Sequence, residues 1–105
     1  MSWLKNFWRG RKVSITQDRH WVELPGVGRV QVARSVDCLG AVCPRPQLLT
    51  MQMVEELAEG EVFELISDNP TSVETIPSLV MVLCSSHLAT VRDAEGWRIY
   101  IRKGM

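Results

Sequence analysis

The sequence has little that would let it cross a membrane, hold a structural metal or build a disulfide framework. Its longest uninterrupted apolar run, residues 79–84, is far too short to span a bilayer. Its N-terminal residues lack the apolar core and small-residue cleavage site of a secretory signal peptide. Three cysteines and two histidines occur among 105 residues, and they have neither the even number of a disulfide framework nor zinc-finger spacing. We therefore expect a cytoplasmic protein with free thiols, no metal and no other cofactor.

An excess of charge of one sign is also missing, because twelve Lys and Arg residues balance twelve Asp and Glu residues. The distribution along the chain is uneven. Residues 1–34 carry seven basic and two acidic residues, a balance of +5, whereas residues 35–105 carry five and ten, a balance of −5. This asymmetry indicates separate roles for the two parts, and the acidic part is poorly suited to direct nucleic-acid binding.

The first twenty residues are predicted to be a basic, aromatic arm and a polar linker, and residues 21–105 to be the folded domain. A short helix in the arm would place four large apolar side chains on one face: Trp3, Leu4, Phe7 and Trp8. These side chains could contact a membrane surface or a partner. We favour packing on the protein's own surface, including across a homodimer, because so short a helix is marginal alone.

Alternation of apolar and polar residues, with Pro25 and Gly26 in the turn, predicts a β-hairpin that begins at Trp21. Its second arm is expected to run into a longer strand that ends near Cys38. Three further strands are predicted at residues 61–66, 88–92 and 97–101.

Two helices are predicted between these strands. The first ends near residue 58 and has four apolar residues on its buried face: Leu49, Met53, Val54 and Leu57. The second follows the capping signal of Asp68 and Asn69. Pro77 removes a backbone donor, so we expect the continuous part of this helix to begin near Thr75 or to be kinked there.

Cys43 stands at the start of the first predicted helix and is the leading candidate for a reactive side chain. Pro44 fits the first helical position, and Pro46 still lies in the first turn, where a missing amide costs no intrahelical bond. Unpaired amides and the positive end of the helix dipole favour a thiolate there, and Arg45 adds a positive charge. Gly40 permits a backbone bend that brings strand end and helix start together. We therefore predict that the pKa of Cys43 is lower than that of a free thiol.

Five residues of this stretch, with a leucine-rich helix behind them, resemble the motif of a known sulfur-carrier family: Asp37, Gly40, Cys43, Pro44 and Pro46. This family includes TusA and SirA-like proteins, and the resemblance covers about residues 35–103. It implies an α/β (α+β) two-layer sandwich in which two helices cover one face of a mixed four-stranded sheet. The hairpin within residues 21–34 would extend that sheet at its edge.

The resemblance also implies a function for Cys43. It would accept sulfane sulfur as a persulfide from a desulfurase or rhodanese-like donor protein and hand it to an acceptor protein. Such a protein is a sulfurtransferase-type carrier rather than a stand-alone catalyst, and Asp37, Gly40, Pro44, Arg45 and Pro46 would support its site. Two alternatives stay open: a redox-sensing or regulatory binding module, and an adaptor to a membrane sulfur transporter or a sulfur-oxidation complex.

The remaining candidate residues have structural interpretations that compete with functional ones. Cys38 could resolve a persulfide on Cys43, but we favour an inward-facing strand residue. Cys84 continues the apolar stripe of the second helix and is expected in the core. Asp37 is expected to cap or brace the loop. His87 occupies the family's histidine position, and we favour a helix cap over a catalytic role.

Overall fold

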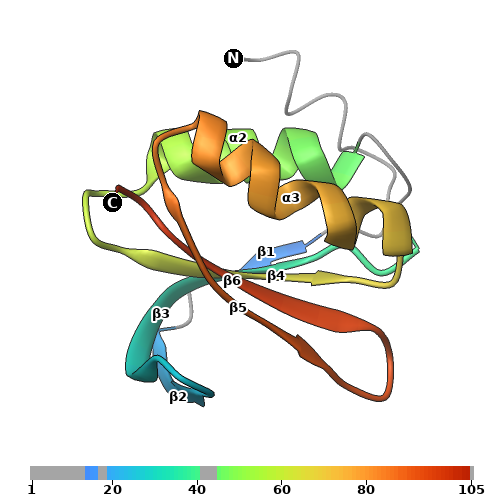
Figure 1. The fold of residues 1–105 in the computed structure, drawn as a ribbon, viewed down its shortest axis with the longest axis horizontal. Coiled ribbons are helices and arrows are strands. Elements are labelled where there is room, and N and C mark those ends of the chain that lie inside the picture. Colours follow the sequence, from blue (N-terminus) through green and yellow to red (C-terminus); the bar gives the residue numbers. More distant parts are fainter. Residues whose placement is uncertain (1–13, 17–18, 41–44, 105) are drawn as a thin grey trace.

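The computed structural model describes residues 14–16, 19–40 and 45–104 (Figure 1). The four apolar side chains of the arm therefore lie outside the described residues. The described elements are β1 Ser14–Thr16, β2 His20–Leu24, β3 Gly28–Asp37, α2 Arg45–Glu56, β4 Val62–Ser67, α3 Pro70–Val82, β5 Ser86–Arg92 and β6 Trp97–Arg102. Both helices cover the same face of one sheet (Figure 1), so the predicted two-layer α/β sandwich is confirmed.

The sheet is mixed, and its strands follow the order β1-β3-β4-β6-β5, with β2 also paired to β3. Strands β3 and β4 are parallel, whereas every other pairing is antiparallel. The predicted four-stranded sheet with its hairpin lacks one strand, β1, because the sequence predicts a linker at these residues. This three-residue strand is too short and too polar to show alternation, and its pairing from Ser14 to Asp37 depends on an exposed edge of β3.

The predicted β-hairpin is present, and its second arm is the ten-residue strand β3. A register shift between Val32 and Arg34 interrupts the pairing of β3 with β4. Such a bulge changes which face of the sheet the following side chains of the strand point to. Val32 accordingly packs in a cluster with Leu24 and Val62, whereas Ala33 and Val36 pack in the main core.

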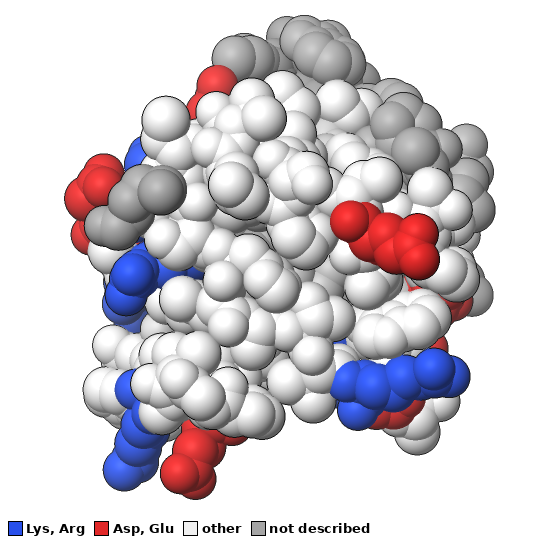
Figure 2. Space-filling model, in the orientation of Figure 1, with Lys and Arg blue, Asp and Glu red and all other residues white. Residues whose placement is uncertain are grey.

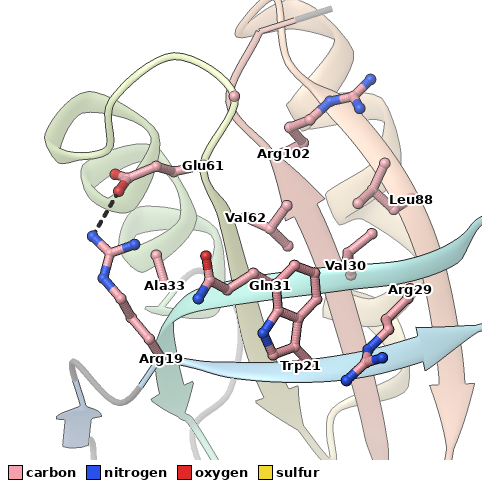
Figure 3. Close-up of a pocket in the computed structure, with 11 residues that line it drawn as sticks. Arg19, Trp21, Arg29, Val30, Gln31, Ala33, Glu61, Val62, Leu88 and Arg102 are labelled. Atoms are coloured by element: carbon pink, nitrogen blue, oxygen red, sulfur yellow. Dashed lines mark hydrogen bonds and ion pairs between the residues drawn. The ribbon is translucent and has the colours of Figure 1, made fainter.

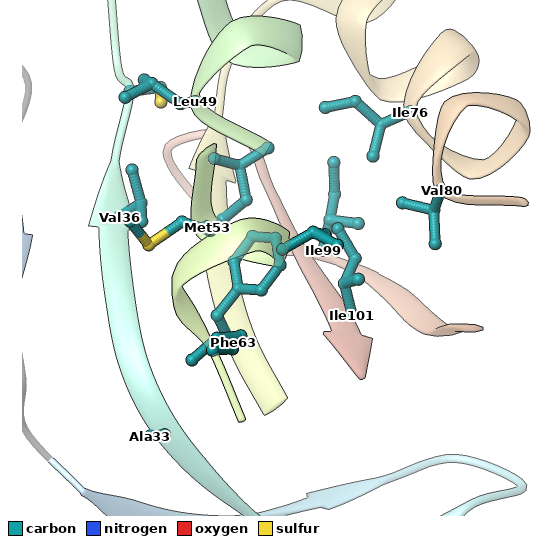
Figure 4. Packing of buried hydrophobic residues seen from close by; sticks show 13 residues of the cluster. Ala33, Val36, Leu49, Met53, Phe63, Ile76, Val80, Ile99 and Ile101 are labelled. Atoms are coloured by element: carbon teal, nitrogen blue, oxygen red, sulfur yellow. The ribbon is translucent and has the colours of Figure 1, made fainter. Parts of the chain in front are cut away.

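The main core lies between the sheet and the two helices (Figure 4). Phe63 and Leu65 from β4 and Ile99 from β6 are fully buried there. Leu49 and Met53 from α2 pack on this layer, as the predicted stripe required. Burial of side chains of this size contributes roughly 1.5–3 kcal/mol each, so this layer fixes the helices on the sheet.

Helix α3 begins at Pro70, so of the two predicted alternatives a start near Thr75 is wrong, whereas a kink there stays a prediction. Its start is well capped, because the Asn69 side chain accepts a hydrogen bond from the Ser72 amide at 2.9 Å. Pro70 adds a residue that fits the first turn. Pro77 lies inside the helix, where burial of Ile76 and Val80 on the sheet offsets the loss of one backbone hydrogen bond.

The side of the molecule formed by α3 and β5 carries few charged side chains (Figure 2). Near the end of α3, Met81 is 70% exposed and Val82 is 78% exposed. Exposed apolar side chains that lie together are typical of surfaces that contact other proteins.

A buried carboxylate occupies the sheet face that points away from the helices. Glu64 lies between Phe63 and Leu65 in β4, so its side chain points to the opposite face. It accepts hydrogen bonds from the Tyr100 hydroxyl at 2.6 Å and the Ser35 hydroxyl at 2.7 Å. Burial raises the pKa of Glu64, but these two bonds and the Arg98 guanidinium, 3.2 Å away, lower it further, to below its ordinary value.

We predict that Tyr100→Phe lowers the free energy of unfolding by about 1.5–3 kcal/mol at neutral pH, because it removes a hydrogen bond to a buried charge. The folded-state pKa of Glu64 lies below its ordinary value of 4.5. The stabilisation is therefore complete above that value and is lost as the pH falls through the folded-state pKa. Urea denaturation from neutral pH to below 4.5 should show that the difference in free energy of unfolding between wild type and variant becomes smaller as the pH falls. A difference that does not change with pH would contradict this account of Glu64.

Candidate functional site

The loop that contains Cys43 is defined by the two elements that it joins. Strand β3 ends at Asp37, and the Cys38 amide still donates to the Ile66 carbonyl of β4 at 2.8 Å. Helix α2 begins at Arg45. Cys43 and Pro44 belong to residues 41–44, which lie outside the described residues. The site is therefore built from the anchors on both sides of this segment.

The first anchor is a turn at the end of β3. The Asp37 carboxylate accepts a hydrogen bond from the Leu39 amide at 3.0 Å, so it braces the loop as predicted. The Gly40 amide donates to the Asp68 carboxylate at 3.1 Å. Gly40 has a φ of +84°, and an added Cβ would meet nothing within 4 Å. Glycine is favoured here by its left-handed backbone and not by lack of space.

The second anchor joins the starts of the two helices. The Gln47 side chain in the first turn of α2 donates to the Thr75 hydroxyl of α3 at 2.9 Å. Pro46 is buried, and its carbonyl accepts a hydrogen bond from the Thr50 hydroxyl at 2.9 Å. Asp68, which holds Gly40, lies two residues before α3. Both ends of the Cys43 segment are thus tied to the N-terminal end of α3.

Positively charged groups lie on the helix side of the loop, opposite the Asp37 and Asp68 carboxylates that hold its strand side. The two helices run in the same direction, with their N-terminal ends side by side (Figure 1). Unpaired amides at a helix start carry a partial positive charge, and the first turn of α2 contains no acidic residue. Arg45 is the first residue of α2, and its charge lowers the pKa of the neighbouring Cys38 thiol. A thiolate in this loop would be stabilised by these positive groups.

Cys38 faces the core and is fully buried. Burial, with a smaller effect from the Asp37 carboxylate, raises the pKa of its thiol to about 12, despite the opposing charge of Arg45. A thiol with this pKa is almost entirely protonated near neutral pH and is a poor nucleophile. The inward-facing interpretation therefore holds, and Cys38 is badly placed to resolve a persulfide.

His87 lies in strand β5 and not at a helix end, so the expected helix cap is wrong. It is half-buried, its Nε2 atom lies 2.7 Å from the Thr90 hydroxyl, and burial lowers its pKa. His87 is opposite Ile101, at the end of β6 that is far from Trp97. Trp97 pairs with Ser67, next to the Asp68 that holds the loop. The structure therefore places His87 at the end of the sheet away from Asp68.

Cys84 is exposed, which corrects the prediction that it belongs to the core. The apolar spacing continues through Cys84, but α3 ends at Val82. Leu83 caps the helix, and Cys84 has a φ of +58°, a left-handed conformation that turns the chain toward β5. Periodicity shows which residues would share a helix face, but it does not show where the helix stops.

Sequence reasoning missed how Asp68 and Gln47 hold the loop. Asp68 was identified only as part of a capping signal, and Asn69 performs that task. The bond from Gly40 to Asp68 joins residues 28 positions apart, and the bond from Gln47 to Thr75 has the same separation. The only usable signal was the predicted order strand, helix, strand, helix, because two strands joined by a helix can pair in parallel.

Two further observations concern metal ligands and membrane-spanning helices in the described part. Across residues 14–16, 19–40 and 45–104, no three His, Cys, Asp or Glu side chains are grouped so that they could hold a metal ion. Neither of the described helices is long and apolar enough to cross a membrane.

Comparison with known protein families gives one finding. A family model described as Sulfurtransferase TusA matches residues 34–103, which is two thirds of the chain. The match includes both anchors and the Cys43 segment between them.

We predict that the two described cysteines differ sharply in reactivity. In native Cys43→Ser protein near neutral pH, iodoacetamide should modify Cys84, which is exposed, and leave Cys38, which is buried. Peptide mass mapping before and after denaturation measures both sites, and Cys38 should react only in the denatured protein. Modification of native Cys38 at the rate of Cys84 would contradict the placement of Cys38 in the core.

Proposed function

Because the chain belongs to the TusA sulfurtransferase family, we propose that it is a sulfur-relay carrier that works through Cys43. In this proposal Cys43 accepts sulfane sulfur as a persulfide from a desulfurase or rhodanese-like donor protein. It then hands the sulfur to an acceptor protein.

The transfer needs no external oxidant or reductant. The Cys43 thiolate attacks the outer sulfur of the donor's persulfide, and a new sulfur–sulfur bond forms on Cys43. The donor's sulfur–sulfur bond breaks, and its cysteine leaves as a thiolate. The acceptor's nucleophile then attacks the outer sulfur on Cys43 in the same way, and Cys43 returns to a thiolate.

The anchored loop is the observation that carries this proposal. A carrier needs a thiolate that partners can reach, and a thiolate is stabilised by positive charge and by amides at a helix start. Gly40 and Asp68 hold one side of the segment, and Arg45 begins the helix on the other. Pro44 and Pro46 supply residues that suit a first helical turn. Arg45 and the helix start therefore support a low pKa for Cys43 without a neighbouring general base, and they must outweigh the Asp37 and Asp68 carboxylates on the strand side.

The surface of α3 and β5 supports a role in protein contacts. It carries few charges (Figure 2), and Met81 and Val82 are exposed there. A carrier of this kind exchanges partners, so it needs faces that a donor or an acceptor covers only transiently.

We predict that wild-type protein, incubated with a cysteine desulfurase and free cysteine, gains the mass of one sulfur atom. Cys84→Ser is the matched control, because it removes an exposed thiol outside the loop, and it should gain the same mass. Cys43→Ser should gain none while keeping its fold, because the change is nearly isosteric. Intact-mass spectrometry under non-reducing conditions measures all three proteins.

The same experiment separates the carrier from a redox sensor. Sulfur loading that survives in Cys43→Ser would contradict the role of Cys43. A wild-type protein that forms only a disulfide or a sulfenic acid, with no added sulfur, would favour a sensor.

A further inference from the structure

A pocket of about 280 Å³ lies between the β2–β3 hairpin and the start of β4 (Figure 3). Three arginines line it, Arg19 from the residue before β2, Arg29 from β3 and Arg102 from the end of β6. Trp21 and Glu61 also line it. The three arginines come from separate parts of the chain, and their side chains lie around the rim of the pocket (Figure 3).

The pocket is far from the Cys43 loop. Its wall includes Val62, the first residue of β4, and Arg102 pairs opposite Val62. The loop is held at the other end of β4, where Asp68 binds Gly40. A six-residue strand is roughly 20 Å long. A ligand in the pocket would therefore leave the Cys43 loop open.

The charges around the pocket are unbalanced. Arg19 forms an ion pair with Glu61 at 3.0 Å, so one positive charge is neutralised. The Arg29 guanidinium lies 5.3 Å from the centre of the Trp21 ring, which holds it in place without cancelling its charge. No carboxylate in the described part of the chain forms an ion pair with Arg29 or Arg102. Arg29 and Arg102 thus leave two positive charges at the pocket that an anionic ligand could neutralise.

The floor of the pocket is apolar, whereas its rim is charged. Val30, Val62 and Leu88 lie between the arginines in the close-up view (Figure 3). Trp21 is 56% exposed beside them, which is a large apolar area to leave in water. This combination fits a ligand that has both carboxylate and apolar groups.

We propose that this pocket binds an acidic segment of a partner protein. The carboxylates of the segment would pair with Arg29 and Arg102, and an apolar side chain between them would cover Val30, Val62 and Leu88. The volume of about 280 Å³ lies just below the range for small-molecule sites, roughly 300–1,000 Å³, and suits one or two side chains. Binding here does not depend on sulfur chemistry at Cys43.

A nucleic acid is the less suitable polyanion. Binding to a phosphate backbone depends on many Lys and Arg contacts, about 6–10 in well-studied proteins, and so on an extended basic surface. Residues 35–105 carry a balance of −5, and Glu23, Glu59 and Glu61 lie on or beside the segments that form the pocket. A short segment that reaches only the pocket avoids this repulsion.

The experiment uses full-length Cys43→Ser protein labelled with ¹⁵N, so that sulfur loading has no influence. The probe is a short capped peptide of alternating Glu and Leu, titrated at low ionic strength. Amide shifts should change at β2, at the first half of β3 and near Arg102. Arg29→Gln combined with Arg102→Gln should weaken binding by at least about tenfold, because two charge-assisted bonds are lost.

Arg92→Gln is the matched control. Arg92 is an exposed arginine that lies 4.9 Å from the Trp97 ring, the same kind of contact that Arg29 makes with Trp21. It lies at the far end of β5, opposite Trp97, so its loss should leave binding unchanged. If the double variant loses its dispersed amide spectrum, Arg102→Gln alone replaces it, because Arg102 is exposed.

Three results would overturn the proposal. The first is an absence of shift changes at the pocket at millimolar peptide. The second is equal binding of a peptide in which Gln replaces every Glu, since apolar contact alone would then explain it. The third is tighter binding of a single-stranded oligonucleotide at the same salt concentration, which would assign the arginines to phosphate groups.

Discussion

The parallel pairing of β3 with β4 is the constraint on which the arrangement of the site depends. Because the strands are parallel, both end at the same edge of the sheet. Each is followed by a helix, so the starts of α2 and α3 become neighbours. The loop between β3 and α2 can then be tied to the residues that precede α3. The bonds from Gly40 to Asp68 and from Gln47 to Thr75 are consequences of this pairing.

The bulge in β3 lets this one strand contribute side chains to both faces of the sheet. After the bulge, β3 packs under the helices through Val36. Before it, β3 joins β2 in a hairpin that packs on Val62 and Tyr100. The buried Glu64 lies on this same side and is fully paired, so it holds Tyr100 and Arg98 on the sheet without leaving an unsatisfied charge. The anchor of the Cys43 loop thus lies at the C-terminal end of β4, and the arginine-lined pocket lies at its N-terminal end.

Much of the fold followed from local sequence patterns. The stripe of Leu49 and Met53, the Pro-Gly hairpin and the cap at Asn69 each depend on residues close together in the chain. The predictions that were wrong concern features that depend on a contact distant in sequence or on the residue at which a helix ends. Strand β1 exists because β3 offers it an edge. Cys84 is exposed because α3 ends before it, although the apolar spacing continues.

The candidate site was predictable as a motif but not as an assembly. The prolines and Cys43 indicated a helix start, and Asp37 indicated a brace, which the structure shows in its bond to Leu39. Nothing near Gly40 in sequence pointed to Asp68 as its partner. The Cys38 side chain faces the core because the backbone pairing of Cys38 with Ile66 fixes its direction.

The central claim is that the helix start and Arg45 stabilise a thiolate at Cys43. The most direct measurement is the alkylation rate of Cys43 as a function of pH. It uses Cys84→Ser protein, because the exposed Cys84 thiol would otherwise also react. We expect an apparent pKa clearly below about 8.5, the value of a free cysteine. An apparent pKa at or above that value would contradict it.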